Sequence, residues 1–387
     1  MYLAPVGEKP LMRIGIVCYP TYGGSGVIAT ELGKALADLG HQIHFVAYAL
    51  PMRLDGYSGN VFYHEVEMAS YPLFEFPLYT PSLASKIIEV ASFEKLDLVH
   101  VHYAIPHAIS AYLASEVLGK KLKFITTLHG TDITLVGLEP SYLPVMKFCI
   151  EASSGVTAVS RFLREKTLTN YGIEKDIRVI PNFVDTAKYK RIECSSIREQ
   201  FAPHNERILV HTSNFRAVKR VPDVIRIFAE VRKKVPAKLL LVGDGPDRSA
   251  CEKLARELDL KDDVRFLGKQ TELVPILSAA DLMLMPSQSE SFGLSALEAM
   301  SCQVPVISSS VGGLPELQVH GQTGYIAEIG DIDRMARYAV ELLTNETKRE
   351  MFGQACRRRA VENFDVKTIV VQYLKYYEEC LGAGVAA

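Results

Sequence analysis

Two glutamates, Glu290 and Glu298, stand eight residues apart around the segment Ser-Phe-Gly-Leu-Ser-Ala-Leu. The pattern predicts a helix over residues 292–300 with Ser291 as its N-cap, because serine is favoured at that position. Glu290 then lies in the preceding loop, where its carboxylate can accept hydrogen bonds from hydroxyl groups, and the first-turn amides can donate to a phosphate. The segment predicts a site for a phosphorylated, hydroxyl-rich ligand. A capped helix with two surface glutamates is the alternative.

A cationic loop follows another predicted strand. Arg216, Lys219 and Arg220 come shortly after Asn214 in the segment Asn-Phe-Arg-Ala-Val-Lys-Arg. Arginine can grip a phosphate at two places and lysine adds a mobile point charge, so these residue types suit an anion site. A solvated basic turn is the alternative, but the position at the carboxyl end of a strand favours binding.

Glycine-rich loops occur at two further strand-to-helix junctions. Gly24 lies in Gly-Gly-Ser-Gly at 23–26, where glycine lets the backbone approach a ligand and the helix start presents amides to anions. This loop also matches a dinucleotide-binding pattern, but the second strand ends without an acidic residue for a ribose, which disfavours a nicotinamide cofactor. Gly243 opens Gly-Asp-Gly-Pro at 243–246, which a plain turn explains equally well.

Several histidines lie near predicted strand ends. His129 follows a strand within Thr-Thr-Leu-His-Gly-Thr-Asp, where it either orients a substrate hydroxyl or is a core residue. His100, His102 and His107 look superficially like metal ligands, but no nearby acid or cysteine completes a site. We therefore expect no metal centre and no cofactor.

The elements that carry these residues alternate between strand and helix. Short runs rich in valine and isoleucine are apolar throughout, which suits strands covered on both faces, and amphipathic stretches lie between them. In the first half the predicted strands are 13–19, 42–48, 96–103, 123–129, 155–160 and 177–181. In the second half they are 207–212, 238–242, 264–267, 282–286, 304–308 and 324–327. Repeated strand–helix units predict parallel, doubly wound sheets of the α/β class.

The alternation of strands and helices starts again in the second half. This predicts two Rossmann-like domains facing a cleft at the carboxyl ends of both sheets. The polar stretch 186–204 contains no clear strand, so we place the boundary near it, giving domains 1–185 and 186–366. Residues 367–381 carry an apolar helical stripe that must pack on another element.

Composition excludes several classes of protein. The 387 residues carry 43 Lys and Arg against 45 Asp and Glu, a net charge of −2, which disfavours a general nucleic-acid binder. No apolar run is long enough to span a membrane, and the first eleven residues lack the apolar core of a signal peptide. Seven scattered cysteines without a CxxC pair indicate reduced thiols. We expect a cytoplasmic protein without membrane or nucleic-acid partners, and a homo-oligomer stays open.

Taken together, these segments resemble the retaining GT-B glycosyltransferases over essentially the whole chain. The resemblance rests on the E-x7-E pair, the Arg216/Lys219 pair, the first glycine-rich loop and Gly-Gly-Leu-Pro-Glu at 312–316. Many relatives place arginine about five residues before the lysine, where this chain has Asn214. The elements His-Tyr-Ala-Ile-Pro-His at 102–107 and Ser-Asn-Phe-Arg at 213–216 are similar to the branch of N-acetylglucosaminyl L-malate synthases of bacillithiol biosynthesis.

The resemblance implies transfer of N-acetylglucosamine from UDP-GlcNAc to the hydroxyl of L-malate, with retention of configuration. It assigns the catalytic region to Arg216, Lys219, Glu290 and His129. The implied donor-binding residues are Gly24, Asn214, Arg216, Lys219, Arg220, Gly243, Leu267, Glu290, Phe292, Gly293, Leu294 and Glu298. In this family the last helix crosses back to the first domain, which would give residues 367–381 a docking face.

Malate is a small dianion, so its site needs hydrogen-bond donors and a cation. The first domain offers Ser25, Tyr103, Thr131, Asn182 and Arg53 as acceptor-binding candidates. For the chemistry we favour front-face attack, in which the leaving phosphate takes the acceptor's proton, over a covalent intermediate on Glu290.

Three other functions fit the same residues. The acceptor could be an inositol phosphate or a lipid-linked sugar. A lipid acceptor needs an apolar surface on the first domain, and the apolar segments 73–77 and 135–143 keep this alternative open. The protein could be a UDP-GlcNAc 2-epimerase of the same architecture, which incubation with UDP-GlcNAc alone would expose. It could also be a sensor of UDP-sugars without catalytic activity.

Overall fold

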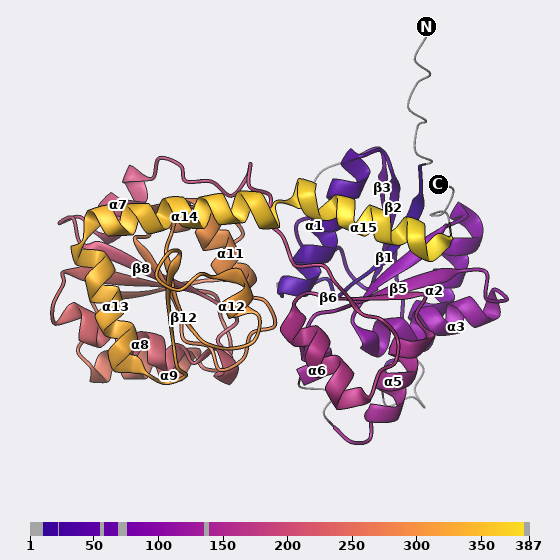
Figure 1. Cartoon of the computed structure of the whole chain (residues 1–387), viewed down its shortest axis with the longest axis horizontal. Helices are drawn as coiled ribbons and strands as arrows, with labels where there is room; N and C mark the ends of the chain where they lie inside the picture. Colours follow the sequence, from indigo (N-terminus) through magenta and orange to yellow (C-terminus); the bar gives the residue numbers. More distant parts are fainter. Residues whose placement is uncertain (1–10, 22, 55–57, 69–75, 135–138, 383–387) are drawn as a thin grey trace, which may run out of the picture. The chain divides into compact units, whose positions relative to one another are not determined.

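The computed structural model describes residues 11–21, 23–54, 58–68, 76–134 and 139–382. The chain divides into two compact units, one made of Met1–Ile180 with Ile369–Ala387 and the other of Pro181–Thr368 (Figure 1). Of the apolar segments 73–77 and 135–143, residues 73–75 and 135–138 lie outside the described residues.

The first unit is built on a parallel sheet of seven strands in the order β3-β2-β1-β4-β5-β6-β7. The order reverses between β1 and β4, as in dinucleotide-binding folds. The strands are β1 Arg13–Val17, β2 Gln42–Ala47, β3 Val61–Glu65, β4 Leu98–His102, β5 Lys123–Leu128, β6 Gly155–Ala158 and β7 Arg178–Val179.

The second unit repeats this plan with a parallel sheet of six strands in the order β10-β9-β8-β11-β12-β13. Its reversal point lies between β8 and β11. The strands are β8 Arg207–Thr212, β9 Ala237–Val242, β10 Val264–Gly268, β11 Leu282–Met285, β12 Val306–Ser309 and β13 Gly324–Ala327. Two doubly wound α/β units are thus confirmed.

Helices connect the strands in both units. The first unit contains α1 Gly24–Asp38, α2 Tyr79–Glu94, η1 Ala104–Ala108, α3 Ile109–Val117, α4 Thr131–Thr134, α5 Leu143–Ala152, α6 Arg161–Tyr171 and most of α15 Val366–Leu381. The second contains α7 Ser195–Phe201, η3 Ala217–Lys219, α8 Val221–Arg232, α9 Arg248–Glu257, α10 Val274–Ala279, α11 Leu294–Ser301, α12 Leu314–Leu317, α13 Ile332–Thr344 and α14 Glu346–Phe364. No helix among the described residues is both long and apolar enough to cross a membrane.

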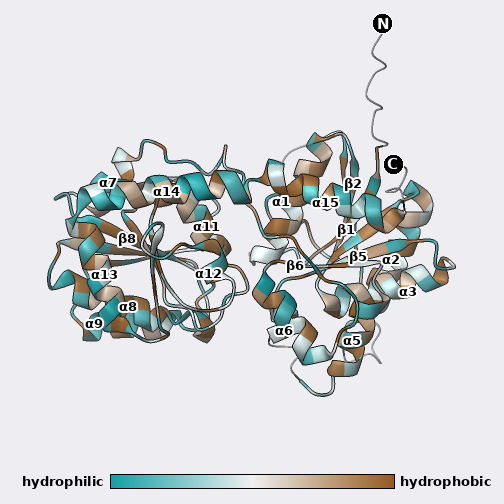
Figure 2. Cartoon of the chain, in the orientation of Figure 1, coloured by the Kyte–Doolittle hydropathy of each residue, from teal (hydrophilic) through white to brown (hydrophobic). Residues whose placement is uncertain are grey.

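The cores lie between the sheets and their helices. In β1, β4 and β11 almost every residue is buried, as expected for strands covered on both faces. Figure 2 shows the same arrangement, with mainly hydrophobic strands and helices that carry both hydrophobic and hydrophilic residues. This burial places the polar loops after the strands at the carboxyl edge of each sheet.

Three elements of the structure that were not predicted show where the sequence pattern fails. The edge strand β3 was not predicted because its sequence, Val-Phe-Tyr-His-Glu, is only half apolar and its residues are partly exposed. The polar stretch expected to be a linker contains the helix α7. Helix α14 was also missed, because its buried residues form no strong apolar stripe.

The division between the units falls at Ile180–Pro181 rather than at residues 185–186. The backbone explains this position, because Val184 donates its amide to the carbonyl of Phe364 at 2.9 Å and the Thr186 hydroxyl donates to the Asp365 carboxylate. These bonds tie the connecting segment to the end of α14. The last helix, α15, packs on the first unit: its Tyr377 hydroxyl lies 2.7 Å from Nδ1 of His100 on β4.

Candidate functional site

In the second unit, Lys219 and Glu290 meet at the reversal point of the sheet. Lys219 ends the short η3 turn after β8, and Glu290 lies in the loop after the neighbouring strand β11. The lysine ammonium donates to Oε1 of Glu290 at 2.5 Å, and the Ser287 hydroxyl donates to the same oxygen at 3.1 Å. In open α/β sheets this point is where ligands bind. A cation and a carboxylate, both partly exposed, are therefore presented together at the expected ligand position.

The backbone of this loop is held by close contact with the loop after β12. The Gly313 amide donates to the Glu290 carbonyl at 2.9 Å. Gly312 has a φ of +57°, and a Cβ atom there would lie only 1.7 Å from the same carbonyl oxygen. Only glycine fits such an approach. The Gly-Gly segment thus fixes the position from which the Glu290 side chain extends.

The helix that carries the second glutamate begins later than predicted. α11 starts at Leu294, with Gly293 as the preceding residue at a φ of +99°, so Ser291 is not its N-cap. A left-handed residue cannot continue a right-handed helix, which explains the later start. Glu298 is 4% exposed inside the unit, and Phe292 is buried against Phe364. The alternative of a surface glutamate at position 298 is therefore wrong, and the contact of Glu298 with the donor ribose stays a prediction.

The other donor-site candidates of this unit differ in their surroundings. Arg216 and Asn214 are exposed in the loop after β8. Arg220 pairs with Asp223 of α8, with Nη2 2.5 Å from a carboxylate oxygen, and Arg226 shares this carboxylate at 2.8 Å. Gly243 packs its α-carbon against the Ser213 carbonyl and donates its amide to Gly268, next to Leu267 in β10.

Sequence reasoning missed a buried histidine beneath this site. His211 on β8 donates from Nδ1 to the Leu284 carbonyl at 2.8 Å, because a carbonyl can only accept. Its Nε2 therefore accepts from the Ser213 hydroxyl, also at 2.8 Å. Burial is the main cause that lowers the pKa of His211 to about 4, and the nearby Lys219 lowers it further. The neutral ring links two strands of the reversal point, and its place inside an apolar strand concealed it.

The first unit shows a second cluster at its own reversal point. Ser25, in the first turn of α1 after β1, lies with its hydroxyl 2.7 Å from the hydroxyl of Tyr103, which follows β4. Burial is the main cause that raises the pKa of Tyr103 to about 12, and hydrogen bonds with Ser25 and Thr131 oppose this rise. The tyrosine is therefore a neutral hydroxyl at physiological pH. The structure brings together three of the predicted acceptor-binding residues.

His129 joins the same cluster from the end of β5. Its Nε2 lies 2.8 Å from Nδ1 of His102, and its ring is 5.4 Å from that of Tyr103. Burial lowers the pKa of His129 to about 3, and the neighbouring His107 lowers it further. The imidazole is thus neutral, and it can donate or accept one hydrogen bond but supplies no charge.

A buried carboxylate organises the loop that holds His129. Asp132 accepts hydrogen bonds from the amides of Gly130 at 2.9 Å, Ala104 at 3.2 Å and His129 at 3.3 Å. These bonds join the loop after β5 to the loop after β4. Sequence reasoning quoted Asp132 within its motif without giving it a role, and a buried acid among turn residues was the available signal.

Two predicted acceptor-binding residues lie elsewhere. Asn182 belongs to the second unit rather than the first, since the connecting segment is hydrogen-bonded to the end of α14. Its Oδ1 is buried without a hydrogen-bond partner among the described residues. Arg53 follows β2, and its carbonyl accepts from Lys34 of α1 at 3.3 Å. Gly24 is the exposed first residue of α1.

Comparison with known proteins gives a consistent result. The model of Glycosyltransferase Family 4 matches residues 22–188, and that of glycosyl transferases group 1 matches residues 195–359. The chain is 47% identical to the N-acetyl-alpha-D-glucosaminyl L-malate synthase of Bacillus anthracis over 371 residues, which is 96% of this chain and 97% of that protein. It is 29% identical to the D-inositol 3-phosphate glycosyltransferase of Salinispora arenicola, over 74% of this chain and 69% of the relative.

Solved structures share the fold at lower identity. The sucrose-phosphate synthase of Thermosynechococcus elongatus matches with a TM-score of 0.79 at 22% identity, over 96% of this chain and all of that one. The Anabaena protein HepE, solved with UDP and glucose, matches with a TM-score of 0.78 at 22% identity, over 94% of this chain and 99% of that one. The two-unit architecture is therefore that of GT-B glycosyltransferases.

Proposed function

Since this chain belongs to the N-acetyl-alpha-D-glucosaminyl L-malate synthase family of GT-B glycosyltransferases, we propose that it transfers N-acetylglucosamine from UDP-GlcNAc to the hydroxyl of L-malate. The structural observation that best supports the proposal is the Lys219–Glu290 pair at the reversal point of the second sheet. It combines a group for phosphate with a group for sugar hydroxyls. The choice of UDP rests on the family resemblance.

The donor half of the reaction needs positive charge next to the leaving diphosphate. As the bond from the anomeric carbon to oxygen breaks, the diphosphate gains negative charge, and a fixed cation lowers the barrier. Lys219 and the exposed Arg216 supply that charge in one loop after β8. The resemblance also implies a role for Arg220, which pairs with Asp223 and would have to turn from it to contact the diphosphate.

Binding of the donor would exchange the partners of the pair. Lys219 and Glu290 satisfy one another through one short ion pair. The diphosphate would take over the lysine, and a sugar hydroxyl would donate to Glu290 in its place. Ser287 still donates to the carboxylate and keeps its orientation. The pair thus holds both groups in place before the ligand arrives, which lowers the reorganisation needed for catalysis.

The acceptor half would use the cluster of the first unit. Ser25 and Tyr103 present two hydroxyls, and Thr131 adds a third next to Tyr103. Such groups donate hydrogen bonds to the carboxylates of malate. The start of α1 adds backbone amides and the positive end of the helix dipole, which favour an anion. His129, which is neutral, would contact the sugar.

For the chemical step we favour front-face attack. Malate's hydroxyl oxygen forms the new bond to the anomeric carbon while the bond to UDP breaks, and the hydroxyl proton passes to the leaving phosphate. A double displacement would need a carboxylate nucleophile at the anomeric carbon. Glu290 is the nearest carboxylate in the sequence motif, but one of its oxygens already accepts from both Lys219 and Ser287. Trapping a glycosyl-enzyme in wild type but not in Glu290→Gln would overturn this choice.

The proposal is tested by release of UDP from UDP-GlcNAc with and without L-malate, followed by mass spectrometry of the product. We expect release that depends on malate and a product with the mass of GlcNAc-malate. Release without malate dependence would reject the acceptor and lead to other hydroxyl acceptors, inositol phosphate among them. Conversion of UDP-GlcNAc alone to its 2-epimer would identify an isomerase. No interaction with any UDP-sugar would reject the donor site.

The cysteines support a cytoplasmic location for this activity. All seven are free thiols, and five of them are buried. Free thiols persist in reducing compartments, whereas secreted proteins tend to pair them. We therefore place the reaction in the cytoplasm.

A further inference from the structure

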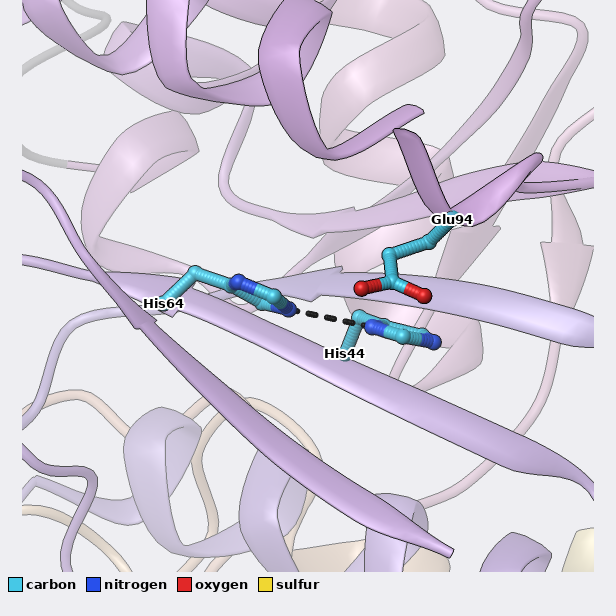
Figure 3. A group of neighbouring side chains, drawn as sticks. All are labelled: His44, His64 and Glu94. Atoms are coloured by element: carbon cyan, nitrogen blue, oxygen red, sulfur yellow. Dashed lines mark hydrogen bonds between the residues drawn. The ribbon is translucent and has the colours of Figure 1, made fainter. Parts of the chain in front are cut away.

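A group of three potential metal ligands lies in the first unit, away from the loops described above. His44 lies on β2, His64 on the neighbouring strand β3, and Glu94 is the last residue of α2 (Figure 3). One ligand atom from each lies within 4.8 Å of those of the other two. Sequence reasoning considered only His100, His102 and His107 as metal ligands, because His44, His64 and Glu94 are far apart in the chain.

The fold explains how these residues come together. Side chains alternate along a strand, so His44 shares a face of β2 with Val46, which packs in the core with residues of α2. In the register of the sheet, Val46 is paired with His64, and paired residues of parallel strands point to the same face. The final turn of α2 then brings Glu94 to that face. Phe62, the register partner of His44, stacks on its ring at 4.8 Å.

The two histidines are prepared to bind a cation. Nδ1 of His44 lies 3.0 Å from Nε2 of His64, so one of these nitrogens carries a proton and the other has a lone pair. Burial, as the main cause, lowers the pKa of His44 to about 4 and also lowers that of His64. Both rings are therefore neutral at physiological pH, the form that binds metals.

The protein leaves this group incompletely satisfied. Nε2 of His44 is buried without a hydrogen-bond partner among the described residues. Within the same part of the chain, the Glu94 carboxylate has no hydrogen bond or ion pair of its own, whereas its backbone carbonyl accepts from Arg13 at 2.9 Å. In Figure 3 the carboxylate lies beside the His44 ring. Buried polar atoms without partners are rare and call for an explanation.

We propose that His44, His64 and Glu94 form a binding site for a divalent first-row transition metal, with Zn²⁺ as the expected ion. Two imidazole nitrogens and one carboxylate oxygen are a common zinc donor set, and the partly exposed His64 and Glu94 leave a fourth position for water. Tetrahedral zinc ligands stand about 3.4 Å apart, so the hydrogen-bonded nitrogens are already close to that spacing. Rotation of the Glu94 side chain would complete the set.

Binding of the metal ion requires no loss of a proton from the protein. The ion takes the place of the proton shared by Nδ1 of His44 and Nε2 of His64, and that proton moves to the other nitrogen of its own ring. Of the charged groups nearby, Glu89 favours the cation and Lys86 and Arg13 oppose it. Lys86 pairs with Glu89 at 2.9 Å, which offsets its charge, and Arg13 donates to the backbone carbonyl of Glu94.

The site would tie the edge strand β3 to α2. Among the described strands, β3 pairs with β2 alone and stands at the edge of the sheet. A metal bound between β2, β3 and the end of α2 would restrain that edge. None of its three residues belongs to the loops that carry the proposed reaction, so the site does not depend on the proposed function.

The experiment titrates chelator-treated full-length protein with Co²⁺, followed by visible absorption, and with Zn²⁺, followed by calorimetry. We expect one equivalent of Co²⁺ to give the absorption of a nitrogen–oxygen site and Zn²⁺ to displace it. His64→Ala and Glu94→Gln should each weaken binding by at least about tenfold, since loss of even an outer partner of a ligand costs that much. His204→Ala and Glu257→Gln are the matched controls, because both residues are exposed and lie in the second unit, apart from the three proposed ligands.

Three results would overturn the proposal. They are the absence of saturable binding at one equivalent, equal affinity in wild type and both ligand variants, and a sulfur-to-cobalt absorption band, which would assign the ion to a thiol. If His64→Ala fails to fold, Glu94→Gln still decides, because it keeps the size of the side chain. Zn²⁺ should also slow amide hydrogen exchange in β3 of the wild type but not of Glu94→Gln.

Discussion

Single side chains at the two reversal points carry the proposed chemistry, and each is held by a partner from a different loop. Lys219 is paired with Glu290, and Tyr103 is bonded to Ser25. Each contact joins the loops after two adjacent strands of its sheet. The reactive groups are therefore oriented before ligands bind, and changes to single atoms should affect one substrate more than the other.

Replacement of Lys219 by alanine removes a cation from the leaving diphosphate. We expect kcat/KM to fall about a hundredfold, corresponding to roughly 3 kcal/mol of transition-state stabilisation. Steady-state UDP release measures the change. Lys233→Ala is the control, since that lysine is an exposed residue paired with Glu230. An equal small effect of both variants would show that Lys219 has no role in the reaction.

The Tyr103→Phe variant removes one hydroxyl and leaves the ring in place. We expect the KM for malate to rise about fivefold, the value of one hydrogen bond of about 1 kcal/mol, while UDP affinity is unchanged. Kinetics at varied malate and calorimetry with UDP separate the two quantities. Tyr142→Phe, at an exposed tyrosine, serves as the control. If UDP affinity falls as much as malate affinity, the role of Tyr103 is structural.

Loops and helices set the positions of these side chains, through close backbone contacts in the loops and through side chains in the last helix. Glycines after β9 and β12 allow carbonyls of the preceding loops to approach closer than any side chain would permit. The last helix, α15, stabilises the first unit through buried tyrosines that bond to strands β4 and β6. Single-residue substitutions can test both the close approach at the glycines and the contacts of α15.

A methyl group at Gly312 should displace the loop that carries Glu290. Gly312→Ala places Cβ 1.7 Å from the Glu290 carbonyl, whereas a Cβ at Gly321 meets no atom within 4 Å. Both glycines have positive φ, so Gly321→Ala should cost only about 1–2 kcal/mol of backbone strain. We expect Gly312→Ala to cost clearly more and to weaken UDP binding. Urea unfolding and calorimetry measure the two effects, and equal stability losses would contradict the close approach.

The contact of α15 with the sheet predicts a cost for losing one hydroxyl. Tyr377→Phe leaves Nδ1 of His100 without its partner at a fully buried position. The free energy of unfolding should fall by about 1–3 kcal/mol, the cost of an unsatisfied buried group. Val371→Ala, on the same helix and 59% exposed, should change it by less than about 0.5 kcal/mol. The urea midpoints of both variants measure the two losses. Equal midpoints would show that the Tyr377 hydrogen bond does not stabilise the protein.

Across the whole molecule, buried histidines couple stability to pH. The pKa values of His100 and His129 fall to about 3, and those of His44, His107 and His211 to about 4, in each case mainly through burial. In the unfolded chain the same groups titrate near 6.5. Between these values the unfolded state binds protons that the folded state does not, so lowering the pH favours unfolding.

We therefore expect the free energy of unfolding to fall between about pH 6.5 and about pH 5, before most carboxylates titrate. Each histidine that stays neutral in the folded state contributes a slope of up to about 1.4 kcal/mol per pH unit. Urea unfolding at several pH values measures the slope, and His100→Asn should reduce it while His204→Gln, at an exposed site, should not. A stability independent of pH over this range would contradict the buried neutral histidines.

The sequence by itself determined the alternation of strand and helix, the two similar halves and the residue types at the strand ends. These follow from local patterns, because burial on both faces requires continuous apolar strands and a ligand-binding turn requires glycine. Most strands of β1 to β13 were predicted for this reason. The half-exposed edge strand β3 was not, since exposure removes the pattern on which the prediction depends.

The tertiary structure decided which of the candidate residues meet. Glu290 pairs with a lysine more than seventy residues earlier, and Asp132 accepts from the amide of Ala104 in another loop, both through contacts between distant segments. Asn182 joined the second unit because its neighbours bond to the end of α14. The group of His44, His64 and Glu94 likewise exists only through sheet register and the end of a helix. No spacing along the chain encodes such contacts, because they depend on how separate elements pack.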